Sequence, residues 1–240
     1  MTELQQLTEH VWVYPHNPDH EAVQPAVGVI VTARETVLVD AGNSPRHARR
    51  ILSELWRIGA PLVSHIIYTH HHWDHIFGAQ IFGGTIIAHE QCRDLIAERY
   101  AAKPWGSSYI QDETRQNPAW ARVLQAMQRA VEDWRGFRVM LPEIVFSRQM
   151  TLYLDGLTVE MRHVGGQHAP ESVTVEVVEE KVLFVGDSYY PPPLLTRKPG
   201  DTPDLHMADA FLQRGLAWYV EGHNKPLTHT EFQQQLTANL

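Results

Sequence analysis

Apolar strands in this sequence repeatedly end in a histidine or an aspartate beside a glycine or a turn. The first case is IIYTHHHWDHIFG at residues 66–78, where four histidines and an aspartate fall between His70 and His75. The same ending recurs in GGQHAPES, LFVGDS and YVEGHN, which place His168, Asp187 and His223 after three later strands. Because strand ends on one edge of a sheet converge in space, we expect these side chains to lie together.

So many imidazoles and carboxylates in one place would repel one another or strand protons unless a cation lay among them. A pair of divalent metals fits, because neutral imidazole and carboxylate bind zinc, iron, cobalt or manganese. His70 and His72 alternate along an extended loop and point the same way, whereas Asp74 and His75 turn back towards a second metal. Asp187 has two oxygens and can bridge both ions. Both ions keep an open position, as catalytic sites do.

Each of these residues also has an ordinary structural interpretation. The histidine-rich loop can be a solvated turn, Asp187 a helix cap and His223 a core residue with its hydrogen bonds satisfied. Their joint occurrence at strand ends, in this order, favours the metal site over those alternatives. The single cysteine, Cys92, argues against a structural zinc knuckle and excludes an internal disulfide, which fits a reducing cytoplasm.

Taken together, these motifs resemble those of the metallo-β-lactamase superfamily. THHHWDH is similar to its HxHxDH pattern, GGQHAPESVTVEV to its third histidine motif, KVLFVGDS to its bridging-aspartate motif and VEGHN to its last histidine motif. TVLVDAG at 36–42 is similar to its early LVDTG element. The resemblance covers nearly the whole chain and implies an α/β protein. It implies one domain over 1–240, folded as an αββα four-layer sandwich with metals at one sheet edge.

Position by position, the resemblance implies two metal ions, each held by three side chains, with one carboxylate shared between them. The first ligand group is His70, His72 and His168, the second ligand group is Asp74, His75 and His223, and the shared carboxylate is Asp187. Zinc is the favoured metal, with iron or manganese as alternatives. Asp40 is expected to orient the ligand loop by hydrogen bonds, and His71 to point away from both metals.

The resemblance further implies a metal-dependent hydrolase. In such an enzyme a water shared by two metals about 3.5–4 Å apart would lose a proton, and the resulting hydroxide would attack a carbonyl or phosphoryl centre. Asp74 would orient the water and accept that proton. An ester, thioester or lactone is the favoured substrate, because the true β-lactamases of the superfamily lack an aspartate at the position of Asp187. The alternatives are a phosphodiesterase, a β-lactamase-like activity, an iron-dependent oxidoreductase of the same fold and a metal-binding module without catalysis.

Residues 90–138 are predicted to form a helical insert. Its two helices, about 90–102 and 118–135, are joined by a loop that contains Trp105. The insert is either a lid over the site or a packing or dimer element, and we expect Trp105 to shape the substrate pocket.

Three further residues near the ligand motifs are candidates for contact with substrate. Tyr190 follows Asp187 by three positions and resembles the tyrosine with which lactonases of the superfamily bind a carbonyl oxygen. Asn224 and Lys225 follow a ligand and are placed to reach an anionic substrate. Packing, for Tyr190, and a solvated turn, for the other two, are the competing interpretations.

Composition narrows the class of partner. The net charge is −8 and no Lys/Arg run tracks a phosphate backbone, which disfavours nucleic acid. No apolar run approaches the roughly 18 residues of a membrane span, and the N-terminal segment has no secretory signal pattern. We therefore expect a cytoplasmic enzyme with a small-molecule substrate. Exposed tryptophans in the insert would permit a dimer without requiring one.

Overall fold

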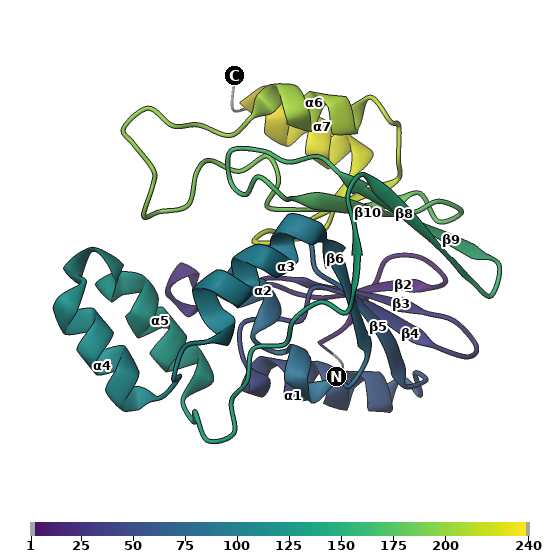
Figure 1. Ribbon diagram of the computed structural model, residues 1–240. Helices are drawn as coiled ribbons and strands as arrows, with labels where there is room; N and C mark the ends of the chain where they lie inside the picture. Colours follow the sequence, from purple (N-terminus) through teal and green to yellow (C-terminus); the bar gives the residue numbers. More distant parts are fainter. Residues whose placement is uncertain (1–2, 239–240) are drawn as a thin grey trace.

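The computed structural model describes residues 3–238, and the two ends of the predicted domain, 1–2 and 239–240, lie outside the described residues. Two β-sheets pack face to face at the centre (Figure 1). The first sheet follows chain order: β1 (Gln5–Gln6), β2 (Val11–Tyr14), β3 (Val27–Val31), β4 (Thr36–Val39), β5 (Val63–Ile67), β6 (Thr85–His89) and β7 (Ile144–Phe146). The second sheet runs β13 (Leu227–Thr228), β12 (Trp218–Glu221), β11 (Val182–Gly186), β10 (Val173–Val177), β9 (Leu157–His163) and β8 (Gln149–Leu154).

Most of the predicted ligands follow strands that pair in parallel. β4, β5, β6 and β7 pair in parallel, and so do β11 and β12. A parallel strand that is covered on both faces is apolar throughout, as VLFVG in β11 is, whereas the edge strand β7 is partly exposed. By contrast, β8 and β9 alternate between buried and more exposed residues. They are joined by a turn at Asp155 and Gly156, both of which have positive φ.

Helices cover the outer face of each sheet. α1 (Pro45–Arg57), α2 (Trp73–Ile76) and α3 (Glu90–Ile96) lie against the first sheet, and α6 (Leu205–Leu212) and α7 (His229–Ala238) against the second (Figure 1). Inward-facing strand residues form an apolar core between the two sheets. A further apolar cluster lies between each sheet and the helices that cover it. The predicted α/β class and αββα sandwich are therefore confirmed.

Capping residues fix where α1 and α7 begin. The Ser44 hydroxyl accepts a hydrogen bond from the His47 N–H at the start of α1, with Pro45 in the first turn. Thr228 and Glu231 form the capping box of α7, since each side chain accepts from the other residue's backbone N–H.

The insert differs from the prediction in its middle. The stretch 103–117, expected as a loop, contains α4 (Ser107–Gln116), which buries a single apolar residue, Ile110. α3 continues as a π-helical turn (Ala97–Ala101), and a 3₁₀ turn (Pro118–Trp120) precedes α5 (Ala121–Val131). The two predicted helices are therefore present near their predicted positions, whereas the prediction of a plain loop between them was wrong. One buried residue leaves too weak an apolar periodicity to reveal α4.

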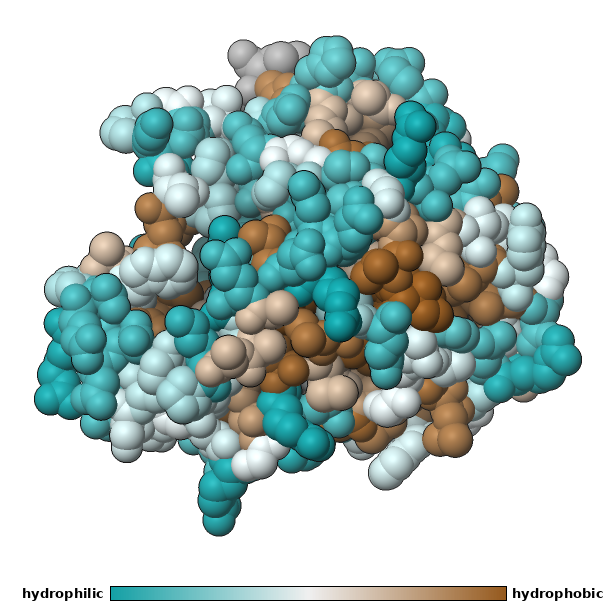
Figure 2. Space-filling view, viewed as in Figure 1, coloured by the Kyte–Doolittle hydropathy of each residue, from teal (hydrophilic) through white to brown (hydrophobic). Residues whose placement is uncertain are grey.

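Two shorter 3₁₀ turns complete the described chain, η1 (His20–Ala22) and η2 (Ala79–Ile81). The space-filling view shows a recess at the left, between the loop ahead of α6 and the α4–α5 insert, with apolar residues along its border (Figure 2). Within residues 3–238, no helix has both the length and the apolar character needed to cross a bilayer.

Candidate metal centre

The ligand loop leaves the end of β5 and is tied to the end of β4 by Asp40. The Thr69 N–H donates to Asp40 Oδ1 (2.8 Å), and the Thr69 hydroxyl donates to Asp40 Oδ2 (2.9 Å). His75 Nδ1 lies 2.7 Å from the same Oδ2. Asp40 has a positive φ of 65°, a backbone conformation that Asp tolerates better than most residues. One buried carboxylate thus holds both ends of the loop that contains His70 and His72.

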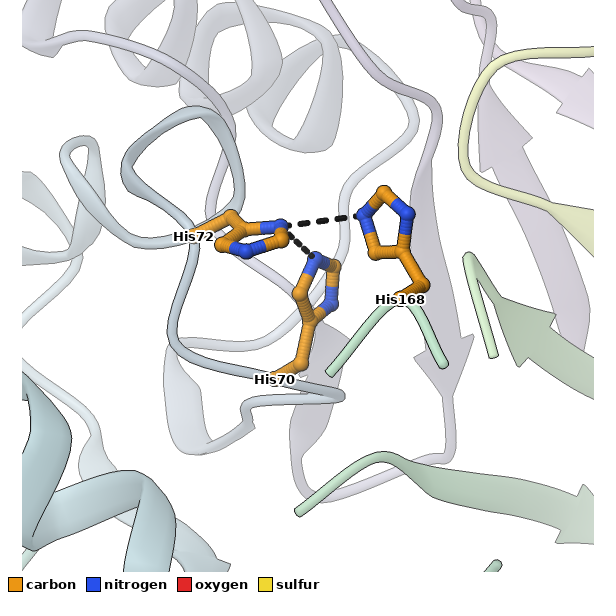
Figure 3. A group of neighbouring side chains, drawn as sticks. All are labelled: His70, His72 and His168. Atoms are coloured by element: carbon orange, nitrogen blue, oxygen red, sulfur yellow. Dashed lines mark hydrogen bonds between the residues drawn. The ribbon is translucent and has the colours of Figure 1, made fainter. Parts of the chain in front are cut away.

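The first ligand group converges on one point (Figure 3). His72 Nδ1 lies 3.0 Å from His70 Nε2 and 3.0 Å from His168 Nε2. His168 Nδ1 donates to the Pro191 carbonyl (2.9 Å), and His70 Nδ1 lies 3.0 Å from the Thr69 hydroxyl oxygen. Since that hydroxyl donates to Asp40, it accepts from His70. Both rings therefore present a nitrogen lone pair to the centre of the group.

The second ligand group gathers beside the first. Asp74 Oδ2 lies 3.1 Å from His223 Nε2 and 3.5 Å from His75 Nε2. Asp74 and His75 belong to α2, which turns the chain back after His72, and His223 follows β12. The two groups are thus brought together from both sheets.

Asp187 lies between the two groups. Its Oδ2 is 3.4 Å from His168 Nε2 in the first group, and 3.5 Å from His75 Nε2 and 3.4 Å from His223 Nε2 in the second. Gly222 packs against this carboxylate so closely that a Cβ there would lie 2.1 Å from Asp187 Oδ1. A glycine is therefore required at 222 for the carboxylate to occupy this position.

The charges of the two groups differ. Burial lowers the pKa of both His70 and His72 well below the usual histidine value. Burial also opposes charge on His75 and His223, but neighbouring carboxylates outweigh it. Asp40, Asp74 and Asp187 raise the pKa of His75 well above its usual value, and Asp187 and Asp74 raise that of His223 to about 10. The second group therefore favours positive charge at its centre.

The residues present fit a divalent metal. His75 Nε2 and Asp187 Oδ1 are buried, and neither has a hydrogen-bond partner within residues 3–238. A buried polar atom left without a partner costs about 1–3 kcal/mol. Imidazole nitrogens and carboxylate oxygens are the donor atoms that zinc and related ions take. A cation at this position would satisfy both atoms.

Comparison with known proteins agrees with this geometry. A family model described as the metallo-beta-lactamase superfamily matches residues 20–217. The chain belongs to the metallo-β-lactamase superfamily. No curated protein matches the sequence significantly.

Solved structures of the metallo-β-lactamase fold cover nearly all of the chain. A metallo-beta-lactamase from Pontibacter korlensis is 18% identical, with a TM-score of 0.65 over 99% of this chain and 98% of its own. A metallo-beta-lactamase family protein from Thermus thermophilus is 19% identical, with a TM-score of 0.65 over 97% and 80%. A double mutant of the sec-alkyl sulfatase PisA1 is 16% identical, with a TM-score of 0.69 over 99% of this chain but 41% of its own. At these identities the likeness establishes the fold.

His71 of this superfamily member points away from the ligand groups, towards a partner that sequence reasoning missed. Its Nδ1 lies 2.5 Å from Glu171 Oε1, which also accepts from the His71 N–H (2.9 Å). Arg99, in the π-helical turn of the insert, donates to His71 Nε2 (2.8 Å). Glu171 is fully buried. An acidic residue three positions after His168 was the available signal.

A second missed carboxylate, Glu221, holds two of the predicted substrate residues, Tyr190 and Asn224, together with Tyr189. The hydroxyls of Tyr189 (2.5 Å) and Tyr190 (3.0 Å) donate to it, and so does the Asn224 amide (3.3 Å). Burial raises its pKa, although these hydrogen bonds act in the opposite direction. An acid at the end of a buried strand, in WYVEG, was the signal for it. Tyr190 thus lies beside the ligand groups with its hydroxyl directed to Glu221.

The other two predicted substrate residues have different surroundings. Lys225 forms an exposed ion pair with Glu231 (2.7 Å). Trp105 stacks on Trp134, with ring centroids 5.6 Å apart, and its Nε1 donates to the Tyr100 carbonyl (2.8 Å). Its ring also lies edge-on to Phe77, which follows α2. The structure therefore places Trp105 inside the insert, one aromatic layer from the ligand loop.

Proposed function

We propose that this chain is a binuclear metal-dependent hydrolase that acts on an ester, a thioester or a lactone, with zinc as the favoured metal. The observation that carries the proposal is the position of Asp187 Oδ2, within 3.5 Å of ligand atoms from both groups. One oxygen shared by two sets of three donors suits a pair of ions better than a single ion. Membership of the superfamily supports the same conclusion.

Two bound divalent ions would supply a water of lowered pKa and would polarise the substrate oxygen. The side chains contribute position and charge. Burial alone would raise the pKa of Asp74, but His75 and His223 lower it, so Asp74 stays ionised and can accept a proton from water. Asp187 also stays ionised, because the same two histidines outweigh its burial.

We infer that substrate would reach the ligand groups from the side on which His223 and His168 are partly exposed. The His223 side chain is 28% exposed and that of His168 10%, whereas that of His75 is fully buried. Pro191, whose carbonyl holds His168, begins the loop that borders the recess in Figure 2. A substrate in this recess would approach open positions on both ions.

We propose Tyr190 as the residue closest to the substrate carbonyl, with Asn224, Lys225 and Trp105 as outer contacts. The Tyr190 ring lies 6.1 Å from that of His168 and 6.5 Å from that of His223.

A buried single cysteine, which leaves no internal disulfide, supports a reducing compartment such as the cytoplasm.

Elemental analysis of protein purified without chelator or affinity tag tests this proposal. We expect about two zinc, manganese or iron ions per chain, as two-metal hydrolases hold. Turnover should then appear in a panel of esters, thioesters and lactones and exceed that on a bis-aryl phosphate. One iron per chain with oxygen uptake would contradict the proposal, and two ions with turnover on the phosphodiester alone would replace the substrate class.

A further inference from the structure

A cavity of about 330 Å³ lies between η1, α1 and α5, and none of its lining residues belongs to the ligand groups. In Figure 1 the short purple helix beside α5 is η1, and α1 runs below both. We call this space the α1 cavity. Its wall includes Arg46, Arg50, Arg129, His47 and Asn43. Three arginines and two carboxylates, Asp19 and Glu21, therefore surround the same space.

The three arginines of the α1 cavity differ in whether they already form an ion pair. Arg46 pairs with Glu132, and Arg129 pairs with Glu21 (3.3 Å). Arg50 makes no hydrogen bond or ion pair within the part of the chain that the structure describes. A guanidinium offers a planar fork of donors that matches the two oxygens of a carboxylate or phosphate. Arg50 is therefore available to an incoming anion.

His47 is the second, independent feature of the cavity. It is 2% exposed and lines the cavity, yet neither ring nitrogen has a hydrogen-bond partner among the described residues. Its ring is packed between Tyr14, 5.1 Å away between centroids, and Gly42, where a Cβ would lie 2.4 Å from Nδ1. Buried polar atoms are normally satisfied. Because Nδ1 faces Gly42, Nε2 is the ring atom that a ligand in the cavity would satisfy.

The protonation state of His47 defines what it offers. Burial, and then Arg50 and Arg46, lower its pKa to about 3, so the ring is neutral at physiological pH. A neutral imidazole has one donor and one acceptor. The arginines therefore provide the charge of the site, and His47 and Asn43 provide polar contacts.

We propose that the α1 cavity binds a small organic anion, with a carboxylate or phosphate group against Arg50 and a further polar group against His47. The Asp19 and Glu21 carboxylates, which also line the cavity, oppose a ligand with several adjacent charges. The amides of Asn17, Gln24 and Asn43 favour hydroxyl or amide substituents on the ligand. The volume is in the range of ordinary small-molecule sites.

Calorimetric titration of the full-length protein, as purified, with inorganic phosphate and separately with succinate tests this assignment. We expect saturable binding of at least one probe, and the stronger of the two identifies the anionic group. Arg50→Ala should weaken that binding by about tenfold or more, the usual scale of a charge-assisted pair. Arg49→Ala is the matched control, because Arg49 is an exposed neighbour on α1 that does not line the cavity.

Two further measurements locate the bound anion. Binding should persist in His168→Ala, which disrupts the first ligand group. The imidazole resonances of His47 should shift on titration of the unmodified chain, which needs no variant to fold. Absence of saturable binding by both probes, equal losses in Arg49→Ala and Arg50→Ala, loss in His168→Ala, or unshifted His47 resonances would each overturn the proposal.

Discussion

Buried histidines lie both in the ligand groups and at the wall of the α1 cavity, where His47 is the one histidine that the described chain contributes, and their ring nitrogens differ in what they contact. In the ligand groups, His75 and His168 each have one nitrogen bound, to Asp40 and to the Pro191 carbonyl, while the other nitrogen faces the shared centre. His47 has neither nitrogen bound. A ring held through one nitrogen presents the other in a set direction, which is what a metal ligand requires. Burial alone therefore does not identify a metal site.

The largest effect should come from the carboxylate that joins the two ligand groups. Asp187→Ala removes the shared oxygen, so the metal content should fall from about two ions per chain to one or fewer. We expect turnover to fall by on the order of 10²–10³-fold or more, as when charge-stabilising groups are removed. Elemental analysis and rate measurements on the same samples check this. Asp209→Ala, exposed on α6, is the control, and an Asp187→Ala protein with both ions and full turnover would contradict the assignment.

Removing the bond that orients His75 should have the next largest effect. Asp40→Asn keeps the side-chain shape, and asparagine tolerates the positive φ at this position. It loses a carboxylate oxygen that accepts from both the Thr69 hydroxyl and the His75 ring. Metal affinity should fall by about 10–100-fold. Competition with a chelator measures this, and thermal unfolding of the same protein shows whether the fold is retained. Unchanged affinity would mean that Asp40 supports only the backbone.

The α1 cavity gives a pH-dependent prediction. The pKa of His47 is about 3 in the folded chain, against roughly 6.5 for an unfolded histidine. Between these values His47 is protonated in the unfolded chain and neutral in the folded chain. Protonation therefore favours the unfolded chain, and the free energy of unfolding decreases as the pH falls. The slope approaches roughly 1.4 kcal/mol per pH unit. Leucine does not titrate. The free energy of unfolding of His47→Leu, relative to that of the original chain, should therefore increase as the pH is lowered from 8 to 5.

Denaturant titrations at several pH values measure that difference. His206→Leu, at an exposed position on α6, is the matched control and should show a much smaller change with pH. A gap between His47→Leu and the original chain that stays constant from pH 8 to pH 5 would show that His47 gains a partner in solution.

The smallest effect is expected outside both histidine sites, at Trp105. Trp105→Phe keeps the aromatic packing and loses the hydrogen bond to the Tyr100 carbonyl. The free energy of unfolding should fall by about 1 kcal/mol, with kcat/KM within about twofold. Trp120→Phe, at a 45% exposed position, is the control. A raised KM with unchanged stability would show instead that the indole N–H of Trp105 is used for the substrate and not for the fold.

The ligand groups could be predicted from the sequence because their spacing is local and their strands are strongly apolar. The segment from His70 to His75 is set by the end of one strand and one helical turn, so few arrangements are available to it. Glu171 and Glu221 escaped prediction, because their role depends on which ring or hydroxyl lies opposite. The position of such an acidic residue in the sequence signals that a partner is needed, but it does not say which residue that partner is.

The fold was predictable in its sheets and less so in its insert. β11 and β12 have continuous apolar runs, and the turn at Asp155 and Gly156 has a composition that requires a hairpin. α4 has no such signal, because Ile110 is its one buried residue and its stability comes from packing against α5. The α1 cavity was missed for a similar reason. The sequence PRHARR in α1 is typical of a solvated helix face. Only the fold shows that η1 and α5 pack beside it and enclose the cavity.

The candidate ligands come from both sheets, since His70 to His75 follow β5 while Asp187 and His223 follow β11 and β12. An ion that binds only when the sheets are docked favours the docked state by mass action, about 2.7 kcal/mol at a free concentration one hundred times Kd. Metal supply would then influence how much of this protein a cell retains, because a less stable chain is removed faster by proteases. Scarcity of the ion would reduce abundance as well as activity.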